Sequence, residues 1–282
     1  MQICGRHFRE SELDWIRNQV KSRPDLNRVQ LSRLFCRYSG WHKPDGGFKE
    51  MSCRVALLRL ERSGLIRLPA PKTTPTPVGK IKRTPQGEPK AHIKLKAGQV
   101  DLAIEAVERK RSPFWNELIE RYHYLGYRRH GGAQMRFFVY AGNHLVALLG
   151  FSAAAWRVAP RDAFIGWNDV QRQKHLYRVV DNSRFLILPW IQSKNLASRI
   201  LSYTARKLPH YWQRRYHYKP LLLETFIEKH RFSGTCYKAA NWICVGQTQG
   251  RGKWDRENAY DKPIKTIWVY PLEHRFKERL CG

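Results

Sequence analysis

The chain is poor in acidic residues and has no long apolar run. Its 282 residues include 52 Lys and Arg but 23 Asp and Glu, which gives a formal charge of +29. Such a charge is too large for an ordinary enzyme of a small neutral substrate, and it indicates an extended polyanion as partner. We therefore expect the chain to bind DNA, either single- or double-stranded.

No apolar stretch approaches the roughly 20 residues that a membrane helix needs. The first six residues also lack the apolar core of a signal peptide. These absences predict a cytoplasmic protein with no membrane partner. The six cysteines form no C-x-x-C pair and no metal-ligand spacing, so we expect reduced thiols. The Gly-rich stretch 247–255 lacks the order of a Walker A nucleotide loop.

Residues 1–68 are predicted to form a separate helical module. Helical spacing of apolar residues, followed by a short strand pattern, places three helices and a strand at 11–20, 27–36, 52–61 and 65–69. This order is typical of a winged helix-turn-helix. Its third helix would present Arg54, Arg59 and Arg62 to phosphates and guanine edges in a major groove. A three-helix packing module with a solvated basic face is the alternative.

Residues 69–92 are predicted to be an extended linker between this module and a larger domain at 93–282. Six of the 15 prolines of the chain fall there, interspersed with lysine and arginine. A segment of this composition has no core of its own. It would follow a phosphate backbone or thread over the second domain.

The large domain is predicted to be α/β (α+β), with a mixed sheet and flanking helices. Its first part is expected to form two helices and a hairpin of two strands, at 101–111, 112–122, 135–140 and 145–151. An irregular stretch that contains Asp162 follows. The pattern then predicts strand, loop, helix, strand, helix and strand at 184–189, 192–195, 196–208, 220–226, 234–242 and 243–247.

This order resembles the core of the GCN5-related acyl-CoA N-acyltransferases, over about residues 136–246. In that family a Gln/Arg-x-x-Gly-x-Gly/Ala loop opens a helix and holds the CoA pyrophosphate on backbone amides. Here the loop reads Gln192-x-x-Asn195-x-Ala197, with Asn195 in place of the middle glycine. Because an asparagine side chain crowds the approach of a pyrophosphate, we expect CoA to bind weakly or not at all.

Short segments of the larger domain carry a second resemblance. They include Ile165-Gly-Trp167 and Arg231-Phe-Ser-Gly-Thr-Cys-Tyr237, and the others lie at 161–162, 182–189, 195–198, 224–226 and 240–242. With them the chain resembles the DruA family, whose members belong to Druantia anti-phage systems and also occur beside bacterial mobile elements. The resemblance implies a defence or mobile-element context, and it implies no particular reaction.

Polar residues within the apolar pattern are the candidates for chemistry. Glu224 directly follows three leucines, and a buried carboxylate needs a cation or a metal. One interpretation is a salt bridge with Arg184. The other is a general base or metal ligand, joined by Asp162 and by Asp181 and Asn182 just before the core strand. Two or three such carboxylates would hold Mg²⁺ for attack on a phosphodiester.

Tyr237 lies in the helix that follows the Glu224 strand, where the acyltransferase family often has a catalytic tyrosine. It would act as an acid in acyl transfer, or attack a phosphodiester to form a covalent link. A core tyrosine with a backbone partner is the alternative. Basic residues expected to bind DNA around the cleft are Arg184, Lys194, Arg231, Lys238, Arg251 and Lys253.

Three functions fit this pattern. The first is a DNA-binding and DNA-processing protein of a defence or mobile-element locus, which cleaves or transfers strands. The second is an acyl-CoA-dependent N-acyltransferase. The third is a non-catalytic adaptor that presents DNA to a partner helicase or nuclease. If the chain is an enzyme, its charge favours phosphodiester chemistry over acetyl transfer.

Overall fold

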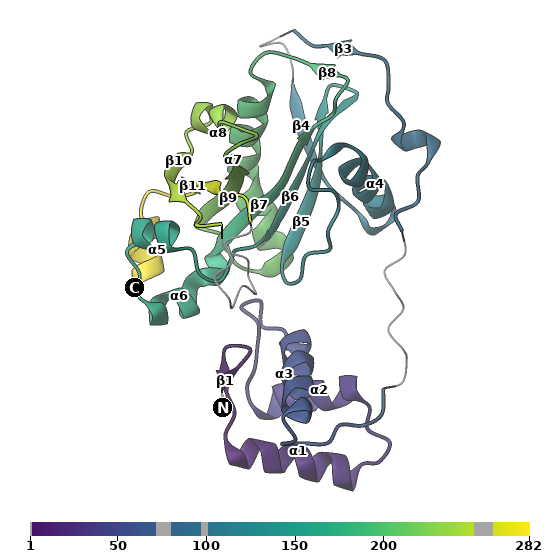
Figure 1. The fold of residues 1–282 in the computed structure, drawn as a ribbon, viewed down its shortest axis with the longest axis vertical. Helices are drawn as coiled ribbons and strands as arrows, with labels where there is room; N and C mark the ends of the chain where they lie inside the picture. Colours follow the sequence, from purple (N-terminus) through teal and green to yellow (C-terminus); the bar gives the residue numbers. More distant parts are fainter. Residues whose placement is uncertain (1, 72–79, 97–100, 251–261) are drawn as a thin grey trace. The chain divides into compact units, whose positions relative to one another are not determined.

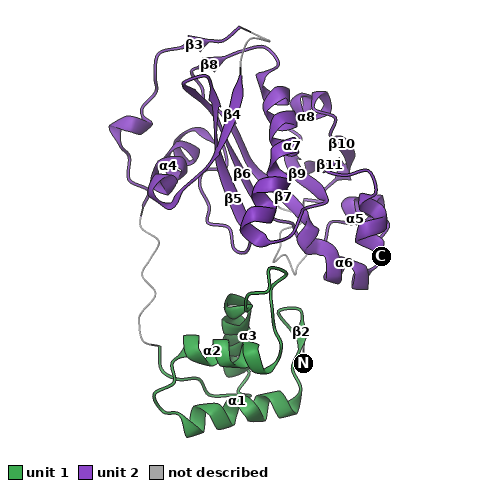
Figure 2. Cartoon of the chain, turned by 180° about the vertical axis from the view of Figure 1, so that it is seen from behind, with its two compact units in different colours: residues 1–79 green, residues 80–282 purple. Residues whose placement is uncertain are grey.

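The structure is a computed structural model that describes residues 2–71, 80–96, 101–250 and 262–282. The chain divides into two compact units, Met1–Gly79 and Lys80–Gly282 (Figure 2). Within the described residues, no helix has the length and apolar character needed to cross a membrane. The six cysteines are free thiols.

The first unit is a small helical module. Its elements are β1 (Gln2–Ile3), β2 (Arg6–His7), α1 (Glu10–Ser22), α2 (Arg28–Tyr38) and α3 (Glu50–Arg62). The helices pack on buried side chains that include Ile16, Leu31, Phe35, Leu57 and Leu60. Asn27 caps α2, because its side chain accepts hydrogen bonds from the amides of Val29 and Gln30 at 3.0 Å. The helices predicted from the sequence match α1, α2 and α3 to within two residues at each end.

The strand predicted at 65–69 is wrong, since these described residues belong to no strand. Side chains of the helices take the hydrogen bonds that a partner strand would have taken. The Arg17 guanidinium donates to the Leu65 carbonyl at 3.1 Å, and the Leu68 amide donates to the Glu61 carboxylate at 3.0 Å. A short segment whose backbone groups are satisfied in this way needs no ladder.

The second unit is organised around a seven-stranded sheet in the order β10-β11-β9-β7-β6-β5-β4. Neighbouring strands are antiparallel except β7 and β9, which are parallel. The strands are β4 (Leu102–Ala106), β5 (Gln134–Ala141), β6 (His144–Ala153), β7 (Val179–Ile187), β9 (Leu222–Glu228), β10 (Ile243–Gln247) and β11 (Lys265–Pro271). A separate parallel pair joins β3 (Ile93–Lys94) to β8 (Ile191–Gln192).

Helices cover both faces of this sheet, so the predicted mixed sheet with flanking helices is confirmed. Helix α4 (Ser112–Tyr122) lies on one face and α7 (Leu196–Tyr216) on the other (Figure 1). Phe137 of β5 packs against Tyr211 of α7, and its neighbour Phe138 packs against Phe114 of α4, with ring centroids 5.3 and 5.9 Å apart. The other helical segments are η1 (Pro85–Gly87), η2 (Arg109–Arg111), α5 (Ala159–Ile165), α6 (Asp169–His175), η3 (Leu176–Arg178), α8 (Thr235–Ala239) and α9 (Phe276–Cys281).

The helix predicted at 101–111 is wrong. Its first half is the edge strand β4, which pairs antiparallel with β5 from Leu102 opposite Ala141 to Ala106 opposite Phe137. Pairing with a long apolar neighbour outweighs the local helical preference of this short segment.

Three candidate residues also lie in elements that the sequence did not predict there. Asp162 lies within α5 (Ala159–Ile165), which has Pro160 in its first turn. The helix is capped by Gly166, whose backbone is left-handed (φ 87°). Asp181 and Asn182 lie inside β7, which begins five residues before the predicted strand, at Val179. Asp181, Asn182 and Ser183 interrupt the apolar pattern of β7, so the apolar run alone does not extend the strand back to Val179.

The second half of the segment predicted as a linker packs against α4. The Thr84 amide and hydroxyl both donate to the Glu117 carboxylate, at 2.6 and 2.7 Å. Arg121 forms an ion pair with Glu88 at 2.8 Å, and the Tyr122 hydroxyl donates to the Gly87 carbonyl in η1 at 2.8 Å. Residues 84–88 therefore run over the surface of the second unit.

Candidate functional site

Strands β7 and β9 pair over three residues and then diverge. The register joins Val179 to Leu222, Val180 to Leu223 and Asp181 to Glu224. Beyond this point β7 follows β6, and β9 follows β11. The sheet is therefore open between two parallel strands on the side of their carboxyl ends, where ligands bind in open α/β sheets.

A cavity of about 570 Å³ occupies this opening, and we call it the cleft. Its walls come from β7, from β9, from the loop after α4 and from the segment that leads into α8. The lining includes six aromatic rings and one exposed arginine: Tyr122, Tyr124, Phe185, Phe226, Phe232, Tyr237 and Arg231. The volume lies within the range of small-molecule sites, about 300–1,000 Å³.

The outer part of the cleft carries an aromatic pair with a cation. The rings of Tyr124 and Phe232 lie 5.2 Å apart, and the Arg231 guanidinium lies 5.0 Å from the centre of the Tyr124 ring. Beside them, burial lowers the pKa of His123 to about 4, assisted by the charge of Arg184. His123 is therefore neutral near pH 7, and Arg231 supplies positive charge at this rim.

Three buried polar side chains form the floor of the cleft. The Tyr237 hydroxyl donates to Asn182 Oδ1 at 2.9 Å, and the Thr225 hydroxyl donates to the Asn182 carbonyl at 3.0 Å. The Asn182 amide donates to the carbonyls of Gly150 and Arg184, at 3.2 and 3.1 Å. This network ties α8, β9, β7 and β6 together at the point where the sheet opens.

A β-bulge in β7 lies next to this network. Gly150 pairs with Arg184 and Phe151 pairs with Asn182, which leaves Ser183 as the extra residue. A Cβ atom on Gly150 would lie 3.1 Å from the Cβ of Arg184, so glycine permits the close approach of the two strands. Bulges increase the local twist and are common beside active sites, which agrees with the divergence of β7 from β9.

Tyr237 is a buried hydrogen-bond donor in the α8 helix. Its ring packs edge-on against Phe185 and Trp242, and burial raises the pKa of its hydroxyl well above the ordinary value. The phenol is therefore protonated near neutral pH, and its proton is directed at Asn182. Such a group positions its neighbours well, whereas an attacking phenolate would first have to lose this proton.

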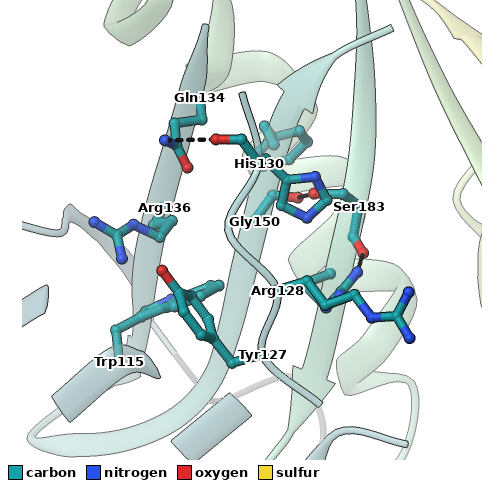
Figure 3. Close-up of a pocket in the computed structure, with 10 residues that line it drawn as sticks. Trp115, Tyr127, Arg128, His130, Gln134, Arg136, Gly150 and Ser183 are labelled. Carbon is teal, nitrogen blue, oxygen red and sulfur yellow. Dashed lines mark hydrogen bonds between the residues drawn. The ribbon is translucent and has the colours of Figure 1, made fainter. Parts of the chain in front are cut away.

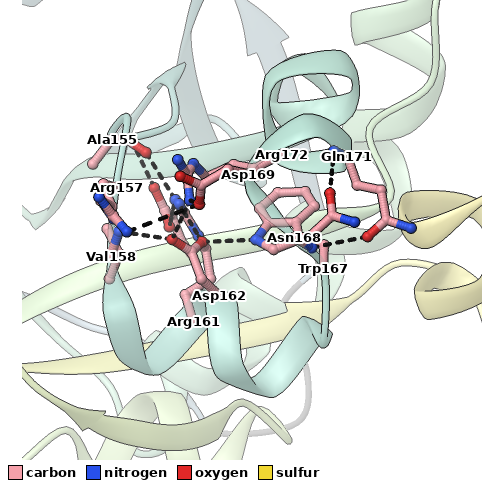
Figure 4. Close-up of polar contacts among 11 residues, drawn as sticks. Ala155, Arg157, Val158, Arg161, Asp162, Trp167, Asn168, Asp169, Gln171 and Arg172 are labelled. Atoms are coloured by element: carbon pink, nitrogen blue, oxygen red, sulfur yellow. Dashed lines mark hydrogen bonds and ion pairs between the residues drawn. The ribbon is translucent and has the colours of Figure 1, made fainter.

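Arg161 joins Glu224 and Asp162 in one cluster, and Figure 4 shows the contacts of Asp162 with Arg161 and Trp167. Arg161 is fully buried and donates to Glu224 Oε2 at 2.8 Å and to Asp162 Oδ1 at 2.7 Å. The other Glu224 oxygen accepts from the Ala155 amide at 2.9 Å, and Asp162 Oδ1 also accepts from Trp167 Nε1 at 3.0 Å. Burial raises the pKa of Glu224, while Arg161 opposes the rise.

This cluster corrects the partner expected for Glu224, which is Arg161 and not Arg184. Arg184 instead donates to the carbonyls of Gly126 and Ser183. A guanidinium bound to both Glu224 and Asp162 does not fit a Mg²⁺ site at this pair, because the cation already present would repel the metal. Among the described residues, no group of three or more His, Cys, Asp and Glu side chains could hold a metal ion.

Asp181 is the neighbour of Glu224 across the β7–β9 pairing, and the charges of Arg184 and Lys265 lie near it. Its Oδ1 atom is buried and has no hydrogen-bond partner among the described residues, and Oδ2 lies 3.5 Å from the Ser152 hydroxyl. Burial, followed by the charge of Glu224, raises the pKa of Asp181 well above its ordinary value. A second cavity of about 400 Å³ borders Asp181, Lys262 and Lys265, and it shares Asn182 with the cleft.

The basic residues predicted to bind DNA are dispersed. Arg231 lines the cleft, and Arg184 lines the second cavity. Lys194 and Lys238 are exposed, and neither contributes to these two cavities as described. Arg251 and Lys253 lie outside the described residues. In the first unit Arg59 and Arg62 are exposed on α3, and Arg54 is half-buried. Residues 39–49 form the connection between α2 and α3.

A smaller pocket beside Arg184 cannot hold a ligand. It lies between the loop 127–130 and strands β5 and β6, and His130, Ser183 and Gln134 border it (Figure 3). Its volume of about 10 Å³ is no more than the space of one water molecule.

The loop whose sequence resembles the CoA pyrophosphate loop has a left-handed residue where the pattern has its middle glycine. Asn195 is left-handed, with φ 59°, and its exposed side chain lies at the start of α7. However, none of the residues 191–197 contributes to the described lining of the cleft. The expectation that CoA binds weakly or not at all therefore stays a prediction.

Comparison with protein families gives a match over most of the chain. The family model for the Druantia protein DruA matches residues 59–267, from within α3 to β11. The chain belongs to the DruA family. The matched range contains the cleft, its floor and the Arg161 cluster, so these are features of the family region of this DruA-type chain.

Similar solved structures include the ribosomal-protein-S18-alanine N-acetyltransferase from Escherichia coli, which is 9% identical (62% of this chain and 96% of that chain covered, TM-score 0.38). The GNAT-family acetyltransferase from Streptococcus pneumoniae is 10% identical (61% and 100%, TM-score 0.40). FeeM, an N-acyl amino acid synthase from uncultured soil microbes, is 13% identical (62% and 93%, TM-score 0.37). A search of curated proteins gives no match. The second unit itself has the mixed sheet with flanking helices predicted from the sequence.

The sequence did not predict a role for several residues of the cleft and of the Arg161 cluster. Tyr124 and Phe232 were assigned no role, although Phe232 directly follows Arg231 and Tyr124 precedes Arg128 and Arg129 by a few residues. Aromatic residues interspersed with basic ones are a signal of nucleic-acid binding. Arg161 is adjacent to Asp162, yet a contact with Glu224, 63 positions away, leaves no trace in one sequence.

Proposed function

We propose that this DruA-family chain serves in anti-phage defence as a DNA-binding adaptor, which holds a single strand in the cleft. The observation that carries the proposal is the pairing of aromatic rings with cationic charge around a cavity of about 570 Å³. Aromatic platforms beside a positive rim are the usual means of holding unpaired bases and their phosphates. The formal charge of +29 supports the same partner.

Binding without strand cleavage is the form of the function that the side chains favour. The residues expected to cleave DNA are Glu224, Asp162, Asp181 and Tyr237. Arg161 already binds two of these carboxylates, and the Tyr237 proton is directed at Asn182. An adaptor presents the strand to a partner helicase or nuclease and needs no such group.

The test is binding of labelled single- and double-stranded oligonucleotides, with and without Mg²⁺, by fluorescence anisotropy. We expect tighter binding of the single strand, no cleavage, and about a tenfold loss of affinity in Arg231→Ala, because one phosphate contact and the cation beside Tyr124 are removed. Arg275→Ala is the matched control, since Arg275 is exposed in an ion pair with Glu278 on α9. Equal losses in both variants, or cleavage of the strand, would contradict the proposal.

A further inference from the structure

The polar side chains on the floor of the cleft have used their hydrogen-bond donors within the protein. Tyr237 has one hydroxyl proton, which points at Asn182 Oδ1, and Thr225 has one, which points at the Asn182 carbonyl. Both amide protons of Asn182 go to carbonyls, and the Ser183 hydroxyl donates to the Gly150 carbonyl at 3.3 Å. Lone pairs of these oxygens are what the floor still offers to a ligand.

These oxygens belong to a largely buried part of the site. Asn182 and Thr225 are 3% exposed and Tyr237 is 7% exposed, yet all three line the cavity. A ligand that brings an N–H group to them gains a hydrogen bond in a partly desolvated setting. A ligand that brings a carbonyl oxygen leaves acceptors facing each other, which is unfavourable.

The charge around the cleft limits which N–H group is accepted. Arg231 lies at its rim, and the buried guanidinium of Arg184 lies behind Ser183. A protonated amine would meet like charges here, whereas a neutral amino group attached to a phosphate-bearing molecule would not. Aromatic rings at the mouth favour a flat group.

We infer that the cleft takes one unstacked base of the single strand and prefers a base with an exocyclic amino group, such as cytosine, over uracil. This inference rests on the proposed function and adds the specificity of the same site. The amino group meets the oxygens of Thr225 and Tyr237, the ring stacks near Tyr124 and Phe232, and the phosphate faces Arg231.

The test compares labelled 12-nucleotide strands of deoxycytidine and of deoxyuridine, whose bases differ in the 4-substituent, amino or carbonyl, and in N3, which accepts a hydrogen bond in cytosine and donates one in uracil. We expect about fivefold tighter binding of the cytosine strand, the effect of roughly one hydrogen bond. Thr225→Val removes one acceptor at nearly constant shape, and it should abolish this preference while the affinity for the uracil strand is kept. Tyr237→Phe should also reduce the preference.

Each outcome separates this inference from the proposed function. Tight and equal binding of both strands by the wild-type chain would overturn the base preference and leave DNA binding intact. Failure to bind either strand would overturn both. Stronger displacement by a lysine-containing peptide than by deoxycytidine would show a site for an amine instead. The wild-type comparison needs no variant, so it holds even if Thr225→Val does not fold.

Discussion

Asp181 shows how a single buried carboxyl group makes the stability of the folded protein depend on pH. Its folded pKa is raised by burial and by Glu224 on the neighbouring strand. At low pH the carboxyl is protonated in both the folded and the unfolded chain. As the pH rises above the ordinary aspartate value, the unfolded chain ionises first, so the free energy of unfolding falls until the folded pKa is passed.

We therefore predict that Asp181→Asn stabilises the protein more at about pH 8 than at about pH 4, because the variant has no proton to lose. Thermal unfolding of the variant and the wild-type chain at both values measures the difference. Asp169→Asn is the control with the opposite sign, since the hydrogen bond from Arg172 lowers the pKa of Asp169. A constant difference between Asp181→Asn and the wild-type chain across this range would show that Asp181 ionises normally.

At the scale of elements, the Arg161–Glu224 ion pair attaches α5 to the interior strand β9. Removing one partner of a buried ion pair leaves the other charge uncompensated, which typically costs about 3–5 kcal/mol. We predict that Glu224→Gln lowers the free energy of unfolding by about 3 kcal/mol, somewhat less than the full range because Asp162 still binds Arg161. Chemical denaturation measures this loss.

Glu228→Gln is the matched control, because it removes the same charge from the same strand outside the Arg161 cluster. We expect it to change stability far less. A Glu224→Gln chain that unfolds like the wild type, yet loses a DNA-cleaving activity, would restore Glu224 as a catalytic residue and contradict the structural role.

The elements that the sequence predicts well are those whose pattern is local. Helices α1, α2, α3 and α4 and the β5–β6 hairpin follow from apolar spacing and turn residues. The edge strand β4 and the start of β7 were missed, because their strand character depends on partners far along the chain and not on their own residues.

The candidate site shows the same division. Glu224, Asp162, Asp181 and Tyr237 could be selected from the sequence as polar residues in apolar surroundings, and the structure places all four around β7 and β9. Their relations could not be predicted, because the hydrogen bonds that decide them run across 55 to 63 positions of the chain.

At the scale of the whole molecule, the excess of 52 basic over 23 acidic residues decides how affinity depends on salt. Each phosphate that the protein neutralises releases condensed counterions, so the logarithm of the binding constant falls with the logarithm of salt concentration, by about 0.7 per phosphate on a single strand and 0.9 on a duplex. For a duplex with about six to ten contacts, we predict a loss of about 10³–10⁵ in affinity from about 50 to 200 mM salt. Titrations at several salt concentrations give the slope for each form of DNA.

If Arg231 contacts one phosphate of the single strand, Arg231→Ala should make the slope shallower by about 0.7, whereas Arg275→Ala should leave it unchanged. An affinity that stays constant across this salt range would mean that the charge of the molecule does not serve to bind DNA.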